Sequence, residues 1–375
     1  MSKKLTVIGR GTAGCYAVAH FHRWTDWEID WVFDNKIKPQ AVGEGSTLDF
    51  PIDLETNTGF NINDLESIYG TLKAGIYKKG WAHGDEFTHT FPSGNVGYHF
   101  NAVMLQEWLM KHFSCRSRVR MVEKNISHAE IDSDYIMDCS GKPNNYGDEY
   151  YNSECIPVNS VYVTQCFWSG VKFQYTLAIA RPYGWVFGIP LLNRCSIGYM
   201  YNNNINTLDE VKNDVKQIFI DFDLTPSDQT NSFNFGNYYR KNNYNSRVAY
   251  NGNASFFLEP LEATSINLMN RNQRRAFDLW NGKKTELQVN IEFLTDIAEI
   301  ENVIMLHYFA GSVFDTEFWK HAQQKGRTNF ESLVKNNKFR QLMDGELDNT
   351  TSYGTWSRAS FTQNLKNLGL VDYLN

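Results

Sequence analysis

The fold class is decided by Leu5-Thr6-Val7-Ile8-Gly9-Arg10-Gly11-Thr12-Ala13-Gly14, a short apolar strand followed by a glycine-rich turn. The next stretch, Cys15 to Trp24, predicts a helix, and Trp27 to Phe33 predicts a second strand. Glycines spaced G-x-G-x-x-G between a strand and a helix permit a tight turn, a close approach to a pyrophosphate and close helix packing. The N-terminus of the helix also presents unpaired N–H groups to phosphate oxygens.

Asp34 strengthens this interpretation. It ends the second predicted strand roughly 20 residues after the last glycine, where a carboxylate accepts a hydrogen bond from a ribose hydroxyl. The alternative is a glycine turn with a chance acidic residue. The context favours a dinucleotide, and the motif alone does not separate NAD from FAD. The predicted cofactor-binding residues are Gly9, Gly11, Thr12, Ala13, Gly14 and Asp34.

Composition and charge exclude several classes of protein. The chain has 375 residues, of which 42% are hydrophobic and 21% charged, so it can bury a core of about two lobes. Its net charge of −6 argues against a nucleic-acid binder. No apolar run approaches the ~18 residues needed to span a bilayer. Six scattered cysteines without a CxxC pair, and the lack of a metal-ligand cluster, predict no metal and a soluble, reducing, cytoplasmic setting.

Hydrophobic patterning predicts strands and helices in the first part of the chain and helices after residue 266. Further strands are expected at 118–122, 135–139, 161–173, 175–180 and 195–201. Further helices are expected at 100–113, 208–222, 271–280, 287–307, 315–324 and 330–343.

Several short strings follow the glycine turn. They are Val42-Gly43-Glu44-Gly45-Ser46-Thr47, Lys73-Ala74-Gly75-Ile76-Tyr77-Lys78-Lys79-Gly80-Trp81, Tyr98-His99-Phe100-Asn101-Ala102, Asp138-Cys139-Ser140-Gly141, Gly184-Trp185-Val186-Phe187-Gly188-Ile189-Pro190-Leu191, Glu259-Pro260-Leu261-Glu262-Ala263-Thr264, Leu306-His307-Tyr308 and Asp315-Thr316-Glu317-Phe318-Trp319. Together they resemble, in order, the motifs of the flavin-dependent halogenases of the tryptophan-halogenase type. Each string is weak by itself, but the ordered set is specific. Residues 320–375 match none of the motifs.

The resemblance implies an α/β fold with a Rossmann-like FAD-binding domain of the flavin-monooxygenase type, a mixed-sheet substrate domain and C-terminal helices. It places a discontinuous FAD lobe at 1–150 and 245–310, with 51–95 reaching toward the substrate site. The substrate lobe is expected at 151–244, and a helical cover at 311–375. The Asn-rich composition adds the hypothesis of a viral, cyanophage-type enzyme in the cytoplasm of its host.

The chemistry implied by the resemblance uses FADH2, dioxygen and a halide ion. These yield hypohalous acid, which a lysine delivers to an electron-rich aromatic small molecule of the indole or phenol type. The expected partners are this substrate and a separate NADH-dependent flavin reductase, because the chain shows no second nucleotide fingerprint. Neither nucleic acid nor membrane is expected as a partner, and an oligomer is left open.

The resemblance also assigns roles to individual residues. Lys73 is the catalytic lysine, the alternative being one more solvated charge beside Lys78 and Lys79. Glu262 is the catalytic carboxylate, with Glu259 as second choice. The remaining assignments are Gly43 and Glu44 beside the flavin, Thr264 and Ser265 for the halide, Trp185, Phe187, Ile189 and Pro190 as a strap between flavin and substrate, and His89 and Phe91 against the substrate.

Two smaller features, Thr264 and His307, are interpreted from their position alone. Thr264 either supplies a backbone N–H to the halide or caps a helix. His307 is interpreted as a core histidine.

Three residues depart from the family motifs, since Phe187, Ala263 and Ser265 stand where the family has Trp, Ser and Gly. Serine adopts fewer backbone conformations than glycine, so the halide loop is expected to be altered. We therefore expect bromide or iodide to be favoured over chloride. The rival functions are a flavin-dependent monooxygenase that hydroxylates an aromatic substrate, and a flavin-binding protein without catalytic activity.

Overall fold

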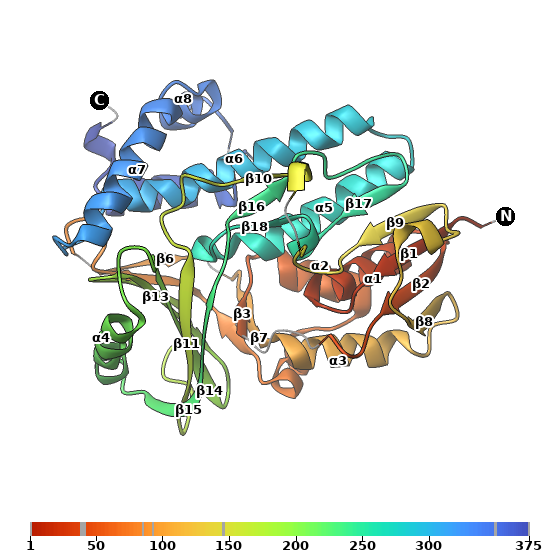
Figure 1. The fold of residues 1–375 in the computed structure, drawn as a ribbon, viewed down its shortest axis with the longest axis horizontal. Helices are drawn as coiled ribbons and strands as arrows, with labels where there is room; N and C mark the ends of the chain where they lie inside the picture. Colours follow the sequence, from red (N-terminus) through yellow and green to blue (C-terminus); the bar gives the residue numbers. More distant parts are fainter. Residues whose placement is uncertain are drawn as a thin grey trace.

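The protein is described by a computed structural model that covers residues 2–37, 43–84, 86–91, 94–144, 147–348 and 351–373 (Figure 1). Val42 of the quoted motif lies outside these ranges. The mixed α/β class predicted from the sequence is confirmed. Within the described residues, no helix is long and apolar enough to cross a membrane.

A parallel five-stranded sheet contains the glycine turn. Its strand order is β17-β9-β1-β2-β8, and its strands are β1 (Lys4–Ile8), β2 (Glu28–Phe33), β8 (Val119–Glu123), β9 (Tyr135–Asp138) and β17 (Val248–Tyr250). Helix α1 (Thr12–Trp24) packs on α2 (Asp49–Thr58), α3 (Ala102–Phe113) and α5 (Thr264–Trp280). In β1, Leu5 and Val7 are fully buried, as expected for a central parallel strand covered on both faces, whereas the edge strand β8 is partly exposed. Residues 248–250 thus join strands from the beginning of the chain.

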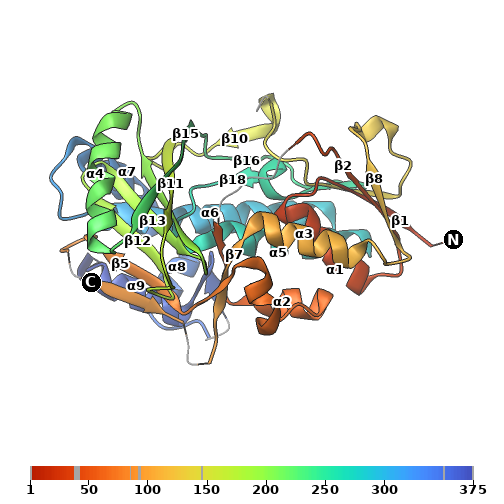
Figure 2. The same cartoon turned by 90° about the horizontal axis from the view of Figure 1, so that it is seen from below.

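A seven-stranded sheet forms the second layer system (Figure 2). Its order is β15-β11-β14-β13-β12-β5-β6, from β5 (Gly75–Lys79), β6 (Phe87–Thr90), β11 (Ser160–Phe167), β12 (Thr176–Arg181), β13 (Gly184–Pro190), β14 (Arg194–Tyr201) and β15 (Thr225–Asn234). Neighbouring strands are antiparallel except β12 and β5, which are parallel.

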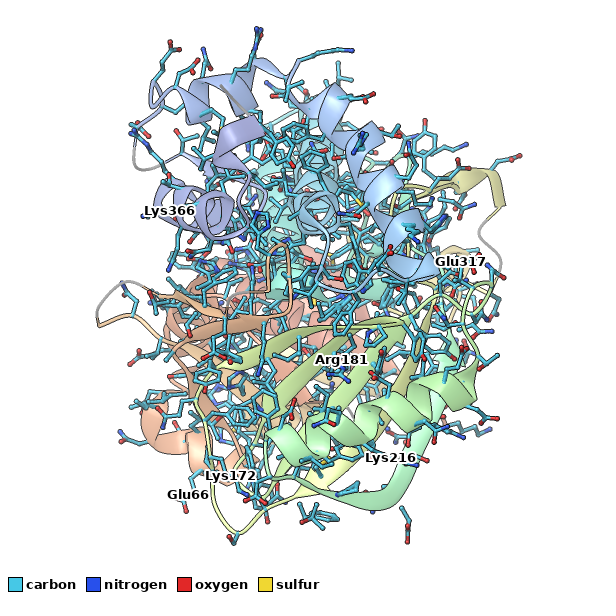
Figure 3. The ribbon with its side chains drawn as sticks, turned by 90° about the vertical axis from the view of Figure 1, so that its left-hand side faces the viewer. Glu66, Lys172, Arg181, Lys216, Glu317 and Lys366 are labelled. Atoms are coloured by element: carbon cyan, nitrogen blue, oxygen red, sulfur yellow. The ribbon has the colours of Figure 1, made fainter. Side chains whose placement is uncertain are left out.

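Helix α4 (Leu208–Asp221) covers one face of this sheet, as Figure 3 shows. Its buried residues Val211, Val215 and Ile218 pack in one apolar cluster with residues of β12, β13 and β14. Arg181 at the end of β12 donates to both carboxylate oxygens of Asp214 on α4, at 2.9 and 2.7 Å. The opposite face of the sheet is therefore free to line the interior of the molecule.

Smaller sheets connect the two large ones. One has the order β3-β7-β4, from β3 (Gly43–Gly45), β7 (Gly97–Asn101) and β4 (Thr71–Lys73). Another has the order β10-β16-β18, from β10 (Tyr150–Asn152), β16 (Tyr238–Arg240) and β18 (Phe256–Phe257). Asn101, the last residue of β7, caps α3 by accepting from the backbone N–H of Val103 at 3.1 Å.

The C-terminal part is mostly helical. It contains α6 (Glu286–Ala310), α7 (Glu317–Leu333), α8 (Asn337–Met343), a hairpin of β19 (Ser352–Tyr353) and β20 (Trp356–Ser357), and α9 (Arg358–Asn367). Helix α6 runs along one side of the molecule and meets α7 near the C-terminal end (Figure 1). Residues of the hairpin, including Tyr353 and Trp356, are buried.

Some predicted elements have other limits in the structure. The helix expected at 330–343 is split, because α7 ends at Leu333 and Asn336 caps a new helix by accepting from the N–H of Phe339 at 3.0 Å. The strand expected at 161–173 ends at Phe167. Strand β15 was not predicted, because it is polar and exposed and therefore lacks the alternating apolar pattern that marks a half-buried strand.

Candidate functional site

The site is a cavity of about 300 Å³ between the seven-stranded sheet and the loop that begins α5. Strand β13 contributes Trp185, Phe187 and Ile189 to its wall, since alternate residues of a strand face the same side. Pro190, which we expected in the same wall, does not line the cavity. It ends β13, and its carbonyl accepts a hydrogen bond from Thr71 Oγ1 at 2.7 Å.

The glycine turn has the geometry of a pyrophosphate cradle. Gly9 has φ +101°, and a Cβ on Gly14 would lie 2.1 Å from the carbonyl oxygen of Gly9, so these two positions fix the turn and the start of α1. A Cβ on Gly11 would meet nothing within 4 Å, so this residue borders open space at the helix N-terminus. These residues fit the phosphates of FAD, which would be held by the first N–H groups of α1.

Glu44 joins the turn to the cavity. It lies on β3, lines the cavity, and accepts from Thr12 Oγ1 at 3.0 Å, while Gln106 donates to the same hydroxyl at 3.2 Å. Burial raises the pKa of Glu44 to about 7. Asp34 directly follows β2, and its Oδ1 accepts from the N–H of Lys36 at 2.8 Å.

Exchange of Gly11 tests the cradle without any catalytic assay. Gly11→Ala should keep the melting temperature of the wild type, because Gly11 has φ −65° and its Cβ would meet no atom, yet it should weaken FAD binding by filling the space next to the helix N-terminus. Gly14→Ala should instead lower the yield of folded protein. Flavin fluorescence titration and thermal unfolding measure the two effects. Unchanged FAD affinity in Gly11→Ala would contradict the cradle.

The start of α5 borders the cavity through Ala263 and Ser265, whereas Thr264 between them is buried and does not line it. Helix α5 begins at Thr264, and Ala263 at its N-cap position makes no side-chain cap. Thr264 is therefore the first helical residue and not the cap, which removes the capping alternative. Ser265 lies inside the helix and is absent from the residues with positive φ, so it does not need the conformational freedom of glycine. The positive φ values of this loop lie at Glu262 and Ala263, and its altered halide geometry stays a prediction. Ser265 lines the cavity.

Glu262 is the most constrained carboxylate of the site. It has φ +69° in a short turn (η5, Leu261–Ala263), and its side chain is buried. Oε1 forms an ion pair with Lys78, and Oε2 accepts from Trp356 Nε1 at 2.7 Å. The Lys78 ammonium and the neighbouring hydrogen-bond donors outweigh burial and hold the pKa of Glu262 well below its usual value. The carboxylate is therefore ionised at neutral pH.

Lys73 is a second charged residue in the lining of the cavity. It is buried at the end of β4 and lines the same cavity as Glu262. No hydrogen bond of its Nζ is found among the described residues, and Nζ lies 5.6 Å from the ring centroid of Phe91. Burial lowers the pKa of Lys73 to about 8, against the opposing charge of Glu262, and the positive charge of Lys78 lowers it further. Lys73 is thus not the solvated charge that was the alternative.

Glu259 differs from Glu262 although both belong to the same string. It is fully buried and accepts from Tyr308 Oη at 2.8 Å. Burial raises the pKa of Glu259 to about 8, so its carboxyl group is mainly protonated at neutral pH. Glu259 does not line the cavity. A base that must be ionised is therefore better provided by Glu262.

His89 and Phe91 contact the two functional groups but do not line the cavity. His89 on β6 is buried, with Nδ1 3.5 Å from Glu262 Oε2, whereas Phe91 lies over Lys73. The two rings meet edge to face, with centroids 6.1 Å apart and planes at 86°, so they do not form two parallel faces around one ligand. His307 is buried as expected for a core histidine, but its Nε2 lies 3.4 Å from Glu262 Oε1.

Sequence reasoning missed three residues that contact this polar cluster: Lys78, Trp356 and Asn364. Lys78 contacts Glu262 directly, Trp356 donates to it, and Asn364 accepts from Lys78 at 2.7 Å. The only signal for Lys78 was its alternation with the buried Ile76 on one strand. Trp356 and Asn364 belong to the segment that resembled no motif, so nothing pointed to them. Among the residues that the structure describes, no group of His, Cys, Asp and Glu is placed to hold a metal ion.

The sequence is similar to those of two tryptophan halogenases. Tryptophan 7-halogenase RebH of Lentzea aerocolonigenes is 24% identical over 260 residues, which cover 60% of this chain and 48% of that protein. Tryptophan 6-halogenase SttH of Streptomyces toxytricini is 20% identical over 260 residues, which cover 61% and 49%. The chain therefore spans about half the length of the curated relatives it matches.

A solved structure has a similar fold, and a family model matches most of the chain. Xcc4156, a flavin-dependent halogenase from Xanthomonas campestris, has a TM-score of 0.81 to this structure at 19% identity, covering 99% of this chain and 90% of that chain, which shows a common fold. A family model described as tryptophan halogenase matches residues 4–118 and 95–371, a range that includes both Lys73 and Glu262. This chain belongs to the tryptophan halogenase family.

Proposed function

We propose that this protein is a flavin-dependent halogenase that acts on an electron-rich aromatic small molecule of the indole or phenol type. The observation that carries the proposal is the wall of the cavity, which joins the unbonded amine of Lys73 to the ionised carboxylate of Glu262. A hydroxylase would need neither group in this arrangement, and a silent flavin-binding protein would gain nothing from two buried charged side chains, which are costly to desolvate.

Bound FADH2 would supply, with dioxygen and a halide ion, one equivalent of hypohalous acid. Halogenation then replaces one aromatic C–H bond by a carbon–halogen bond, and the hydroxyl of the acid leaves as water with one proton. Lys73 would bind the oxidant at the cavity wall, as an ammonium donor or as a neutral amine. Glu262 would accept the ring proton, because it is ionised and faces the same cavity.

The halide would bind at the start of α5. The N–H groups of Thr264 and Ser265 belong to the first turn of a helix and have no intrahelical partner, which favours an anion. Thr264 Oγ1 is buried and has no hydrogen-bond partner among the described residues, so it adds a further donor. The cavity wall is mainly apolar, and bromide or iodide lose their water more easily than chloride, which supports our expectation that the larger halides are preferred.

Two partners follow from the proposal. The aromatic substrate would lie near Phe91 and His89, since these rings flank Lys73 and Glu262. A separate NADH-dependent flavin reductase would supply FADH2, because the sequence shows one dinucleotide fingerprint, which fits FAD.

Product mass tests the proposal most directly. The purified protein with FADH2, dioxygen and equal concentrations of chloride and bromide should convert a simple phenol or indole into a product with the bromine isotope pattern. A product that gained oxygen would favour the monooxygenase, and no product from a broad aromatic set would favour the silent flavin-binding protein. Predominant chlorination would contradict the halide preference alone.

A further inference from the structure

The second buried lysine of the site has a complete set of partners. Lys78 on β5 is fully buried and forms an ion pair with Glu262 Oε1. Its Nζ also donates to Nε2 of His307 and to Oδ1 of Asn364, each at 2.7 Å. An ammonium group has three N–H donors and no acceptor, so these three contacts account for all of them.

The two neutral partners of Lys78 are fixed by further hydrogen bonds. Nδ1 of His307 lies 2.9 Å from the carbonyl oxygen of Val303, and a carbonyl only accepts, so the proton is on Nδ1 and the lone pair of Nε2 faces Lys78. Asn364 Nδ2 donates to the carbonyl of Ser360 at 2.9 Å, which turns Oδ1 toward Lys78. Residues of α6 and α9 thus fix the position of the Lys78 ammonium, whereas the backbone of Lys78 belongs to β5.

Glu262 needs such support, because its backbone is unfavourable. Glu262 and Ala263 have φ values of +69° and +54°, and non-glycine residues in the left-handed region cost on the order of 1–3 kcal/mol each. Lys78 holds one carboxylate oxygen and Trp356 the other, so the plane of the carboxylate is set from two sides.

We infer that Lys78 is a positioning residue, which fixes the Glu262 carboxylate in its ionised form at the cavity wall and leaves Lys73 unpaired. The inference rests on the proposed function, because that function makes Glu262 the catalytic base. The contacts between Lys78 and Glu262 exist whatever the reaction is. The two buried lysines then have different tasks. Among the described residues, Lys73 makes no hydrogen bond and lines the cavity, whereas Lys78 has two hydrogen-bond acceptors and one ionic partner and does not line it.

Four titratable groups face Glu262. These are Lys78 in direct contact, His89 Nδ1 at 3.5 Å, His307 Nε2 at 3.4 Å, and Lys73 on the same cavity wall. Burial lowers the pKa of His307, which therefore adds no charge at neutral pH. Without Lys78, the buried carboxylate would lose its direct ionic partner and would take up a proton more readily, since burial disfavours an unpaired charge. A protonated Glu262 could not act as a base.

The test compares Lys78→Met with Lys79→Met. Lys79 is the next residue on β5 but half-exposed, so its exchange removes the same charge without touching Glu262. Infrared spectra of the whole protein at neutral pH should show, in Lys78→Met, a protonated-carboxyl intensity above that which Glu259 gives in the wild type, and this added intensity should disappear in Lys78→Met/Glu262→Gln. The acidic limb of the pH–rate profile should move up by at least about one pH unit, which is about tenfold in rate at a pH on that limb. Lys79→Met should match the wild type in both measurements.

Asn364→Ala is the second variant, in case Lys78→Met does not fold. It removes one acceptor of Lys78 and should shift the limb in the same direction by less. An unshifted profile and a carboxyl band no stronger than that of the wild type in the folded variants would overturn the inference. If the wild type halogenates nothing but the added carboxyl intensity appears in Lys78→Met, the proposed function fails while the positioning role holds.

Discussion

Lys73→Met should abolish halogenated product while the protein stays as stable as the wild type or becomes more stable. The amine of Lys73 is buried and makes no hydrogen bond among the described residues, so its removal costs the fold only the contact with the Phe91 ring. Its desolvation is a cost that methionine avoids. If Lys73 binds the oxidant, the product should be lost with no change in FAD affinity, measured by mass spectrometry and flavin titration.

The lowered pKa of Lys73 determines how the stability difference between the wild type and Lys73→Met changes with pH. Because the folded-state pKa of about 8 lies below the ordinary value of 10.5, the unfolded chain binds the extra proton between these two pH values. The wild type therefore gains stability as pH rises from about 8 to 10.5. The stability advantage of Lys73→Met should be largest below pH 8 and should shrink over this interval. Lys79→Met is the matched control, and full activity in Lys73→Met would exclude Lys73 from the reaction.

Glu262→Gln should have the second largest effect and should damage both rate and stability. The rate is expected to fall by about 10²-fold, because an amide does not accept the ring proton. Stability should fall by about 3–5 kcal/mol at pH 7, the scale for removing one partner of a buried ion pair, because Lys78 keeps a buried charge without its counter-ion. Thermal or urea unfolding measures the second part.

The depressed pKa of Glu262 determines how the stability difference between the wild type and Glu262→Gln changes with pH. The folded-state pKa of Glu262 is depressed, so the carboxylate stabilises the fold above its unfolded-state pKa of about 4.3, and this contribution is lost as pH falls through the folded-state value. The stability gap between wild type and Glu262→Gln should therefore close in acid. Glu259→Gln is the control from the same string. Glu259 is mainly protonated at pH 7, so this exchange should keep most activity, and the reverse ranking would assign the base to Glu259.

The roles of Lys73 and Glu262 could be proposed from the sequence because each belongs to a string with a recognisable order. The structure places both on one cavity wall, where the proposed roles can be tested. The edge-to-face arrangement of His89 and Phe91 was not predictable, because the spacing of two residues on one strand says nothing about ring orientation. The departure of Pro190 from the cavity wall follows from strand alternation, which places it on the other side from Ile189.

By itself, the sequence determined the features that depend on neighbours along the chain. The approach of Gly14 to the carbonyl oxygen of Gly9 is local, because both residues belong to one turn, and so is the start of α5 after the Glu262 string. Apolar patterning likewise predicted the strand, helix and strand around the glycine turn, while the α/β class as a whole was implied by the resemblance. These features require no knowledge of the rest of the molecule.

Only the tertiary structure decided which of the charges in Lys78-Lys79 is buried and what it contacts. Adjacent residues of a strand face opposite sides, so one of the two lysines points inward, and the sequence alone does not say which face of β5 is covered. That face is covered by α6 and α9, which bring His307 and Asn364 to Lys78 from 229 and 286 residues away. A buried ion pair is stable only with its complete set of hydrogen bonds, and this set exists only after distant elements have packed together.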